Sequence, residues 1–204
     1  MATERQPYFI VLEGLDGVGT TTIAERLSRA LEARDLRVVL TAEPTDGVYG
    51  RLLRRHIHTE VTLDPPAAAL VFTADRADHL ASVIRPALAR GRVVVCDRYL
   101  LSTLAYQGAG GVDHETVLAA SRGFDVPDVT FFLDAPDEVR SERMSGRGRV
   151  DRYEDPAFAG RLREAYRTSV ELLRARGHRI EEVDASRSAD DVLADVLARL
   201  DARD

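Results

Sequence analysis

Short, nearly continuous apolar runs alternate with longer helical segments along this chain of 204 residues, and that alternation constrains its fold more than any other feature. The runs FIVL, VVVC and VTFFL lack the polar and apolar alternation of a strand with one solvent-exposed face. They predict strands that are covered on both faces. Because helices separate them, the sequence predicts an α/β fold of three layers, α/β/α, with helices on both faces of a five-stranded parallel sheet.

The expected elements can be placed by residue number. Strands are predicted at 8–13, 36–41, 92–96, 129–134 and 178–183. Helices are predicted near 21–34, 65–90, 114–122, 136–144, 156–176 and 188–202. Pro65 is typical of a helix start, and Gly91 and Gly177 are typical of helix ends. No repeat or linker divides residues 1–204, so we expect a single domain, with the stretch SGRGRVDR at 145–152 as a mobile loop.

Composition excludes several classes of protein. With 45% hydrophobic and 30% charged residues, the chain has enough apolar surface for a core, which excludes a disordered or fibrous protein. No apolar run approaches the length of about 20 residues that a membrane-spanning helix needs. The opening MATERQP does not resemble a secretory signal, so we expect a cytoplasmic protein without membrane contact. The net charge of −6 argues against a nucleic-acid polymer as partner.

A glycine-rich segment joins the first predicted strand to the first predicted helix. It contains, in order, Gly14, Leu15, Asp16, Gly17, Val18, Gly19, Thr20, Thr21 and Thr22. The segment matches a phosphate-binding loop at Gly14, Gly19 and Thr21. Glycines let successive N–H groups turn toward a phosphate, and the following helix adds the positive end of its dipole. The Thr21 hydroxyl is placed to bind Mg²⁺.

The lysine of such a loop is missing, because Thr20 occupies its position. All 28 basic residues of the chain are Arg, and a drift from Lys to Arg retains a positive charge. Thr20 is therefore a change in chemistry. The lost charge-assisted contact is worth about 1.5–3 kcal/mol if nothing replaces it. The backbone and Thr21 keep their functions, which predicts a phosphate site with weakened positive charge.

An acid and a base follow the third predicted strand. Asp97 and Arg98 emerge together at its carboxyl end, which in a parallel sheet lies at the same edge as the phosphate loop. Asp97 suits a carboxylate that binds Mg²⁺ or positions water, and Arg98 suits a clamp on an acceptor phosphate. A surface ion pair is the alternative for such a dipeptide. The position after a buried strand favours the functional interpretation.

Further motifs make the chain resemble the thymidylate kinase family of nucleoside monophosphate kinases over nearly its whole length. The most specific are EGLDG at 13–17, FTADR at 72–76, DRY at 97–99, LST at 101–103, AYQG at 105–108 and GRVDR at 148–152. The resemblance implies a P-loop NTPase-type fold, phosphoryl transfer from ATP to dTMP giving dTDP, and a requirement for Mg²⁺. It also implies a homodimer.

The same resemblance implies roles around the acceptor nucleotide. Phe72 would stack on the thymine ring, and Arg76 would hydrogen-bond the base edge. Thr103 and Gln107 would lie near the base. Tyr106 would lie beneath the sugar, where it disfavours a ribose 2′-hydroxyl.

Two acidic residues also match the family pattern. Asp16 would act in catalysis by organising Mg²⁺-bound water near the transferred group. Glu43 would belong to the substrate-binding segment after the second strand. Ala42 replaces the Arg commonly found before this Glu, so one acceptor-side cation is absent.

The predicted lid, about 144–153, resembles that of the bacterial-type branch, in which lid arginines reach the donor phosphates. Arg149 and Arg152 would act in catalysis and supply the charge that Thr20 does not. Arg147 would contact ATP, as would Arg143, for which stacking on adenine is an alternative.

Two other functions remain open. Because Thr20 and Ala42 both change phosphate-facing chemistry, the acceptor could be a different or modified deoxynucleoside monophosphate. The second is a nucleotide-binding protein without transfer activity. Turnover measured with dTMP and with other deoxynucleoside monophosphates distinguishes both alternatives from a slow dTMP kinase.

Overall fold

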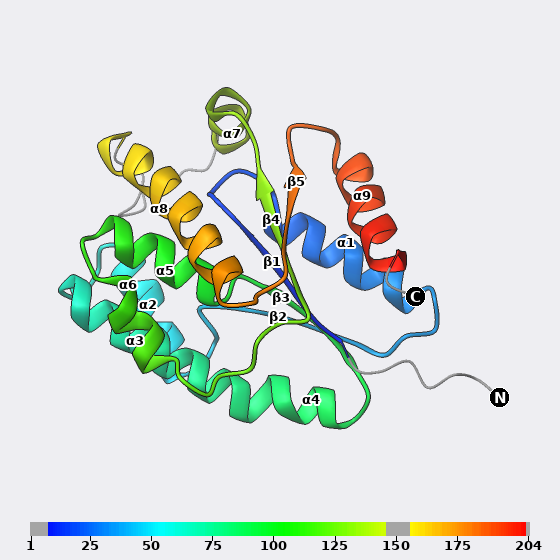
Figure 1. Cartoon of the computed structure of the whole chain (residues 1–204), viewed down its shortest axis with the longest axis horizontal. Helices are drawn as coiled ribbons and strands as arrows, with labels where there is room; N and C mark the ends of the chain where they lie inside the picture. The colour runs from blue at the N-terminus through cyan, green and yellow to red at the C-terminus, as the bar shows by residue number, and fades with distance from the viewer. Residues whose placement is uncertain (1–7, 146–155, 203–204) are drawn as a thin grey trace.

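The computed structural model describes residues 8–145 and 156–202, and it forms a five-stranded parallel sheet between two layers of helices (Figure 1). The strand order is β2-β3-β1-β4-β5. The strands are β1 (Phe9–Gly14), β2 (Val38–Ala42), β3 (Val93–Asp97), β4 (Val129–Asp134) and β5 (Ile180–Asp184). This arrangement confirms the predicted P-loop NTPase-type α/β/α fold.

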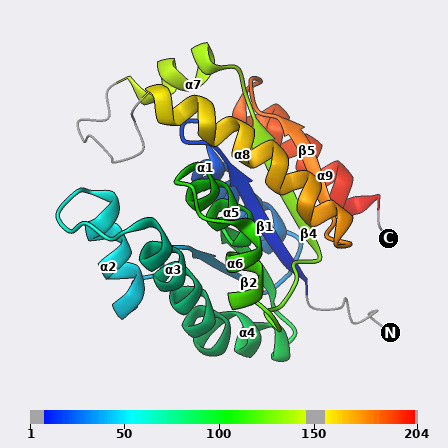
Figure 2. The ribbon, with the colours of Figure 1, turned by 60° about the vertical axis from the view of Figure 1, so that its left-hand side comes forward.

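Helices from distant parts of the chain cover the two faces of the sheet (Figures 1 and 2). α1 (Thr20–Glu32) and α9 (Ala189–Asp201) lie on one face, and α5 (Leu100–Ala109) and α8 (Pro156–Ala175) pack together on the other. The other helical elements are α2 (Val48–Ile57), α3 (Pro65–His79), the π-helical η1 (Leu80–Ile84), α4 (Arg85–Ala89), α6 (His114–Ala120) and α7 (Asp137–Met144). Among the residues described, no helix is long and apolar enough to cross a bilayer.

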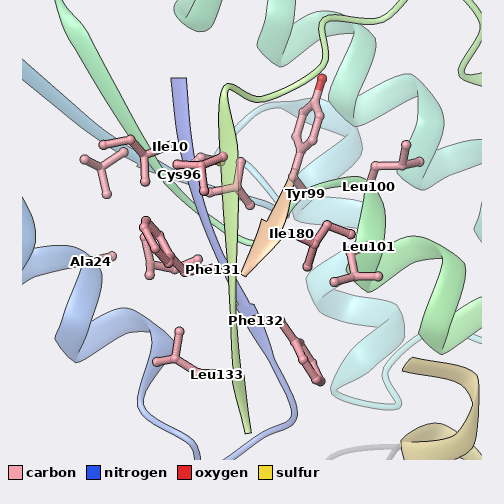
Figure 3. Packing of buried hydrophobic residues seen from close by; sticks show 14 of the residues in the cluster. Ile10, Ala24, Cys96, Tyr99, Leu100, Leu101, Phe131, Phe132, Leu133 and Ile180 are labelled. Carbon is pink, nitrogen blue, oxygen red and sulfur yellow. The ribbon is translucent and has the colours of Figure 1, made fainter. Parts of the chain in front are cut away.

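The core lies on both sides of the central strands. β1 and β3 are buried along their whole length, whereas the edge strands β2 and β5 are partly exposed. Successive side chains of β4 point to opposite faces, with Phe131 toward α1 and Phe132 on the other side (Figure 3). The Phe132 ring stacks on Tyr166 of α8 with the ring centroids 5.3 Å apart. Both faces of the strand are apolar because both are covered.

The predicted strands are confirmed, with ends that shift by up to two residues, and 129–134 matches at both ends. The predicted helix 65–90 differs, because η1 interrupts it. Pro86 has no N–H group to continue the α-helical bonding. The preceding turn widens, so that the Arg85 N–H group bonds the Leu80 carbonyl five residues earlier. Gly91 and Gly177 follow their helices with positive φ angles of 67° and 85°, as expected for helix ends.

The sequence pattern does not predict α2 and α5. Every residue of α5 from Leu100 to Gln107 is buried, so this helix has no polar face and no amphipathic period. α2 contains Gly50, which is unusual in a helix interior. A Cβ atom at Gly50 would lie 1.9 Å from the Thr45 carbonyl oxygen, so the close approach of the preceding loop requires glycine. Most of the predicted lid lies outside the described residues; α7 ends at Met144, where the lid was predicted to begin.

Candidate active site

The phosphate loop joins β1 to α1 at the carboxyl edge of the sheet. Gly17 and Gly19 have φ angles of 88° and 94°, in the left-handed region that glycine adopts without strain. Gly17 must also be small, because a Cβ atom there would lie 2.8 Å from the Arg140 carbonyl oxygen of α7. α1 has no side-chain N-cap and no acidic residue in its first turn. No loop side chain therefore competes with an anion for the N-terminus of this helix.

The two threonines after Gly19 have different surroundings. Thr20, at the position of the missing lysine, is buried. The Thr21 hydroxyl donates to Oδ2 of Asp97 in β3 at 2.5 Å. The other carboxylate oxygen, Oδ1, is buried without a hydrogen-bond partner in the described part of the chain. The fold thus brings the two predicted Mg²⁺ ligands together and leaves one carboxylate oxygen unused.

Arg98 lies directly after β3, with a positive φ angle of 70°. Its Nη2 donates to Oδ1 of Asp16 at 2.6 Å, and its Nη1 donates to the Gly14 carbonyl at 3.0 Å. The hydroxyls of Ser102 and Tyr166 also lie 3.2 Å from Nη1. The guanidinium is therefore held against the phosphate loop.

Tyr106 of α5 binds the other carboxylate oxygen of Asp16. Its hydroxyl donates to Oδ2 at 2.9 Å, and the Arg98 guanidinium lies 5.6 Å from its ring centroid. Burial raises the pKa of Tyr106 well above its ordinary value, against the opposing effect of Arg98. The phenol therefore stays protonated and remains a donor, so Asp16 is fixed from two sides.

Glu13 is a residue of this site to which the sequence pattern assigns no role. Its buried carboxylate accepts the Tyr99 and Ser102 N–H groups at 2.8 and 3.0 Å and the Ser102 hydroxyl at 2.5 Å. Because these groups lie at the N-terminus of α5, Glu13 caps that helix from a neighbouring strand. Burial raises the pKa of Glu13 to about 7, and the Ser102 hydrogen bonds and Arg98 partly offset this effect. The only feature of the sequence that could have identified Glu13 is its position as an acidic residue at the end of a continuous apolar run.

A pocket of about 180 Å³ lies next to Asp16 and Arg98. α3 contributes Phe72 and Arg76 to its wall. α5 contributes Thr103, predicted to lie near the base, and Tyr106, predicted to lie beneath the sugar. The lining residues are Asp16, Glu43, Pro44, Ile57, Phe72, Arg76, Asp97, Arg98, Tyr99, Ser102, Thr103 and Tyr106. Gln107 is buried in α5 but does not line the pocket, and its Nε2 has no partner among the described residues.

Glu43 lies in the pocket wall with its carboxylate engaged by other side chains. Oε2 accepts from Nη2 of Arg76 at 2.6 Å, and Oε1 lies 3.0 Å from Nδ1 of His79. Ala42, which ends β2, is paired with Asp97 in the sheet. The fold therefore places Glu43 close to the predicted acceptor site, with its oxygens facing Arg76 and His79.

Two arginines of α7 contact backbone carbonyl groups of the phosphate loop. Nε of Arg140 donates to the Asp16 carbonyl at 3.0 Å. Nη1 of Arg143 donates to the Ala185 carbonyl at 2.8 Å and lies 3.5 Å from the Val18 carbonyl. Arg143 also lines a second pocket of about 240 Å³, together with Val18, Gly19, Thr22, Ile23, Ala185, Arg187, Ser188, Ala189 and Val192. The predicted lid residues Arg147, Arg149 and Arg152 lie outside the described residues.

A phosphate loop after β1, a carboxylate at the end of β3 and an adjoining pocket with two arginines define the class of P-loop phosphotransferases. Comparison with known proteins then gives the family. The thymidylate kinase family model matches residues 12–196. The chain belongs to the thymidylate kinase family and is a nucleoside monophosphate kinase.

Individual relatives agree with this assignment over nearly the whole chain. A thymidylate kinase of Leifsonia xyli is 42% identical over 210 residues, which cover 98% of each chain. A probable thymidylate kinase of Pyrobaculum calidifontis is 39% identical over 190 residues, which cover 93% of this chain and 94% of the relative. The similarity therefore extends over the phosphate loop and the pocket alike.

Proposed function

We propose that this chain transfers the γ-phosphoryl group of ATP to dTMP, giving ADP and dTDP, in a reaction that requires Mg²⁺. The observation that carries the proposal is the position of the phosphate loop beside a pocket lined by Phe72, Arg76 and Arg98. An acceptor phosphate oxygen attacks the γ-phosphorus, the bond to the bridging oxygen breaks, and ADP leaves. The names of the relatives support dTMP as the acceptor.

The donor phosphates would bind the N–H groups of the loop and the N-terminus of α1. Thr20 provides no positive charge there, so we propose that Arg149 and Arg152 of the lid supply it, with Arg147 on ATP as well. The pocket beside Arg143 is the candidate for the adenine end. Loss of one preorganised stabilising group in other enzymes lowers kcat by about 10²–10³. We expect the lid arginines to offset this loss only in part, which leaves a kinase slower than one with the loop lysine.

The residues next to the loop fit a Mg²⁺ ion. Asp97 has a buried carboxylate oxygen without a partner among the described residues, and Thr21 lies 2.5 Å from the other oxygen. Mg²⁺ binds through one or two protein oxygens and otherwise keeps waters and phosphate oxygens, so this small donor set is sufficient. When bound, the ion supplies charge stabilisation to the phosphates. Thr21 and Asp97 would hold it.

On the acceptor side, the fixed Arg98 would clamp the phosphate of dTMP. Asp16, bound to both Arg98 and Tyr106, would orient the groups around the transferred phosphoryl. Phosphoryl transfer depends mainly on in-line positioning and charge, with little covalent chemistry from the protein. The contacts of Asp16 and Arg98 provide that preorganisation.

The family resemblance also supports a homodimer, a single nucleoside monophosphate kinase domain over 1–204, and a cytoplasmic location. Gel filtration with light scattering tests the first of them.

An assay of ADP release with Mg-ATP and a panel of dTMP, dUMP, dCMP and dGMP tests the proposed acceptor. We expect dTMP to give the highest kcat/KM of the panel. A different preferred nucleotide would overturn the choice of dTMP while leaving the kinase assignment intact.

A further inference from the structure

A chain of hydrogen-bonded side chains, most of them buried, leads from the edge strand to the base pocket. The Thr41 hydroxyl of β2 lies 2.7 Å from Nε2 of His79, at the end of α3. Nδ1 of His79 lies 3.0 Å from Oε1 of Glu43, whose Oε2 accepts from Nη2 of Arg76 at 2.6 Å. The same Nη2 donates to the Thr103 hydroxyl at 2.8 Å. The side chains of Arg76 and His79 are each 1% exposed and that of Glu43 is 3% exposed, so water does not compete for the contacts among these three residues.

The partners determine how protons are arranged along this chain. A carboxylate only accepts, so Nδ1 of His79 donates to Glu43. The Thr41 hydroxyl bonds the other ring nitrogen, Nε2, so both nitrogens of the imidazole have partners. Glu43 and Arg76 form a buried pair of one negative and one positive charge. Each oxygen of Glu43 thus has a donor, which a buried carboxylate requires.

This arrangement leaves part of Arg76 without a partner. The Glu43 and Thr103 contacts use Nη2, and the guanidinium lies 4.7 Å from the ring centroid of Tyr99. Nε and Nη1 are buried without a hydrogen-bond partner among the described residues, and Arg76 lines the pocket. A guanidinium only donates, so its unpaired N–H groups require an acceptor. Leaving such a donor unsatisfied costs about 1–3 kcal/mol.

We propose that His79 is a positioning residue for base selection. Through Glu43 it fixes the Arg76 guanidinium so that the unpaired N–H groups favour an acceptor base with a carbonyl on its edge and disfavour one with an amino group. His79 does not touch the substrate. This inference rests on the proposed function for the identity of the acceptor, and it adds the residues behind Arg76 that set the selectivity.

The test compares dTMP with dCMP, whose ring carries an amino group where dTMP has a carbonyl. His79→Leu removes both hydrogen bonds and leaves Oε1 of Glu43 unpaired, which frees the carboxylate and with it Arg76. Calorimetric titration should show dTMP affinity falling about tenfold, and the preference for dTMP over dCMP falling by about the same factor. KM for ATP should stay within about twofold. A purely structural role would not change this base preference selectively.

His178→Leu is the matched control, since His178 precedes β5 at the opposite edge of the sheet and is only half-buried. If His79→Leu does not fold, Thr41→Val tests the role of His79 instead, because it removes only the hydroxyl that bonds the imidazole. We expect Thr41→Val to lower the preference about threefold. An unchanged preference in the folded variant overturns the role of His79. Because binding needs no turnover, a wild-type protein that selects dTMP without phosphorylating it would overturn the proposed activity alone.

Discussion

The carboxylate of Glu13 accepts three hydrogen bonds from the turn that follows Arg98, although burial alone favours its neutral form. Two of the donors are backbone N–H groups at the start of α5. The hydrogen bonds of Glu13 therefore help to fix both the Arg98 turn and the helix that carries Thr103 and Tyr106. Hydrogen bonds to one buried side chain thus link the phosphate side of the site to the base side.

The raised pKa of Glu13 predicts a specific pH dependence of stability. Its pKa is about 7 in the folded protein and 4.5 in the unfolded chain, so the folded state binds a proton more tightly. The corresponding stabilisation is fully present below pH 4.5 and is lost as the pH rises through 7. The unfolding free energy of the wild type relative to Glu13→Gln should fall by about 3 kcal/mol between pH 4 and pH 8. Urea unfolding at several pH values measures this difference.

The control is Glu171→Gln, on the exposed surface of α8. The wild type and this control should change in parallel across the same pH range. A constant difference between wild type and Glu13→Gln would show that Glu13 does not titrate in this range.

At the scale of elements, α7 packs directly against the phosphate loop. Gly17 leaves room for the backbone of α7 at Arg140, and the Arg140 side chain bonds the Asp16 carbonyl. Arg140 is itself held by Asp137, whose Oδ1 lies 2.6 Å from its Nη1. In a loop without lysine, this contact from a neighbouring helix helps to fix the backbone of the phosphate loop at Asp16.

Arg140→Ala should therefore weaken ATP binding more than dTMP binding. Loss of a hydrogen bond from a charged donor to the loop predicts an increase of about five- to tenfold in KM for ATP, with KM for dTMP little changed. Steady-state kinetics with each substrate varied in turn measures both constants. Arg29→Ala, which removes an exposed arginine of α1, is the matched control. Equal effects of the two variants on KM for ATP would contradict this role for α7.

The accuracy of the sequence-based prediction differs between elements for physical reasons. Strands such as β1 and β3 are predictable because burial on both faces makes them continuously apolar. α5 is equally buried, so it lacks the period that identifies a surface helix. α2 contains Gly50, a residue that depends on the path of the neighbouring loop. Local patterns therefore identify these strands better than these two helices.

At the scale of the whole molecule, the strand order brings the site together. β1 lies between β3 and β4, so the phosphate loop and Asp97 meet at one edge of the sheet. The proximity of the phosphate loop and Asp97 can be predicted from the sequence, because parallel strands end at the same edge of a sheet. The Asp16 contact to Tyr106 and the Glu43 contact to His79 join residues far apart in sequence. Such contacts depend on helix packing, which no local pattern specifies.

The claim on which the account depends is that this fold transfers a phosphoryl group although Thr20 replaces the loop lysine. Measurement of kcat with Mg-ATP and dTMP, for the wild type and for Thr20→Lys, tests it most directly. Thr168→Lys, on the exposed surface of α8, controls for the added charge. We expect measurable turnover by the wild type, an increase of about 10–100-fold in Thr20→Lys, and no change in the control. A wild type that binds both nucleotides but transfers nothing, while Thr20→Lys is active, would contradict the account.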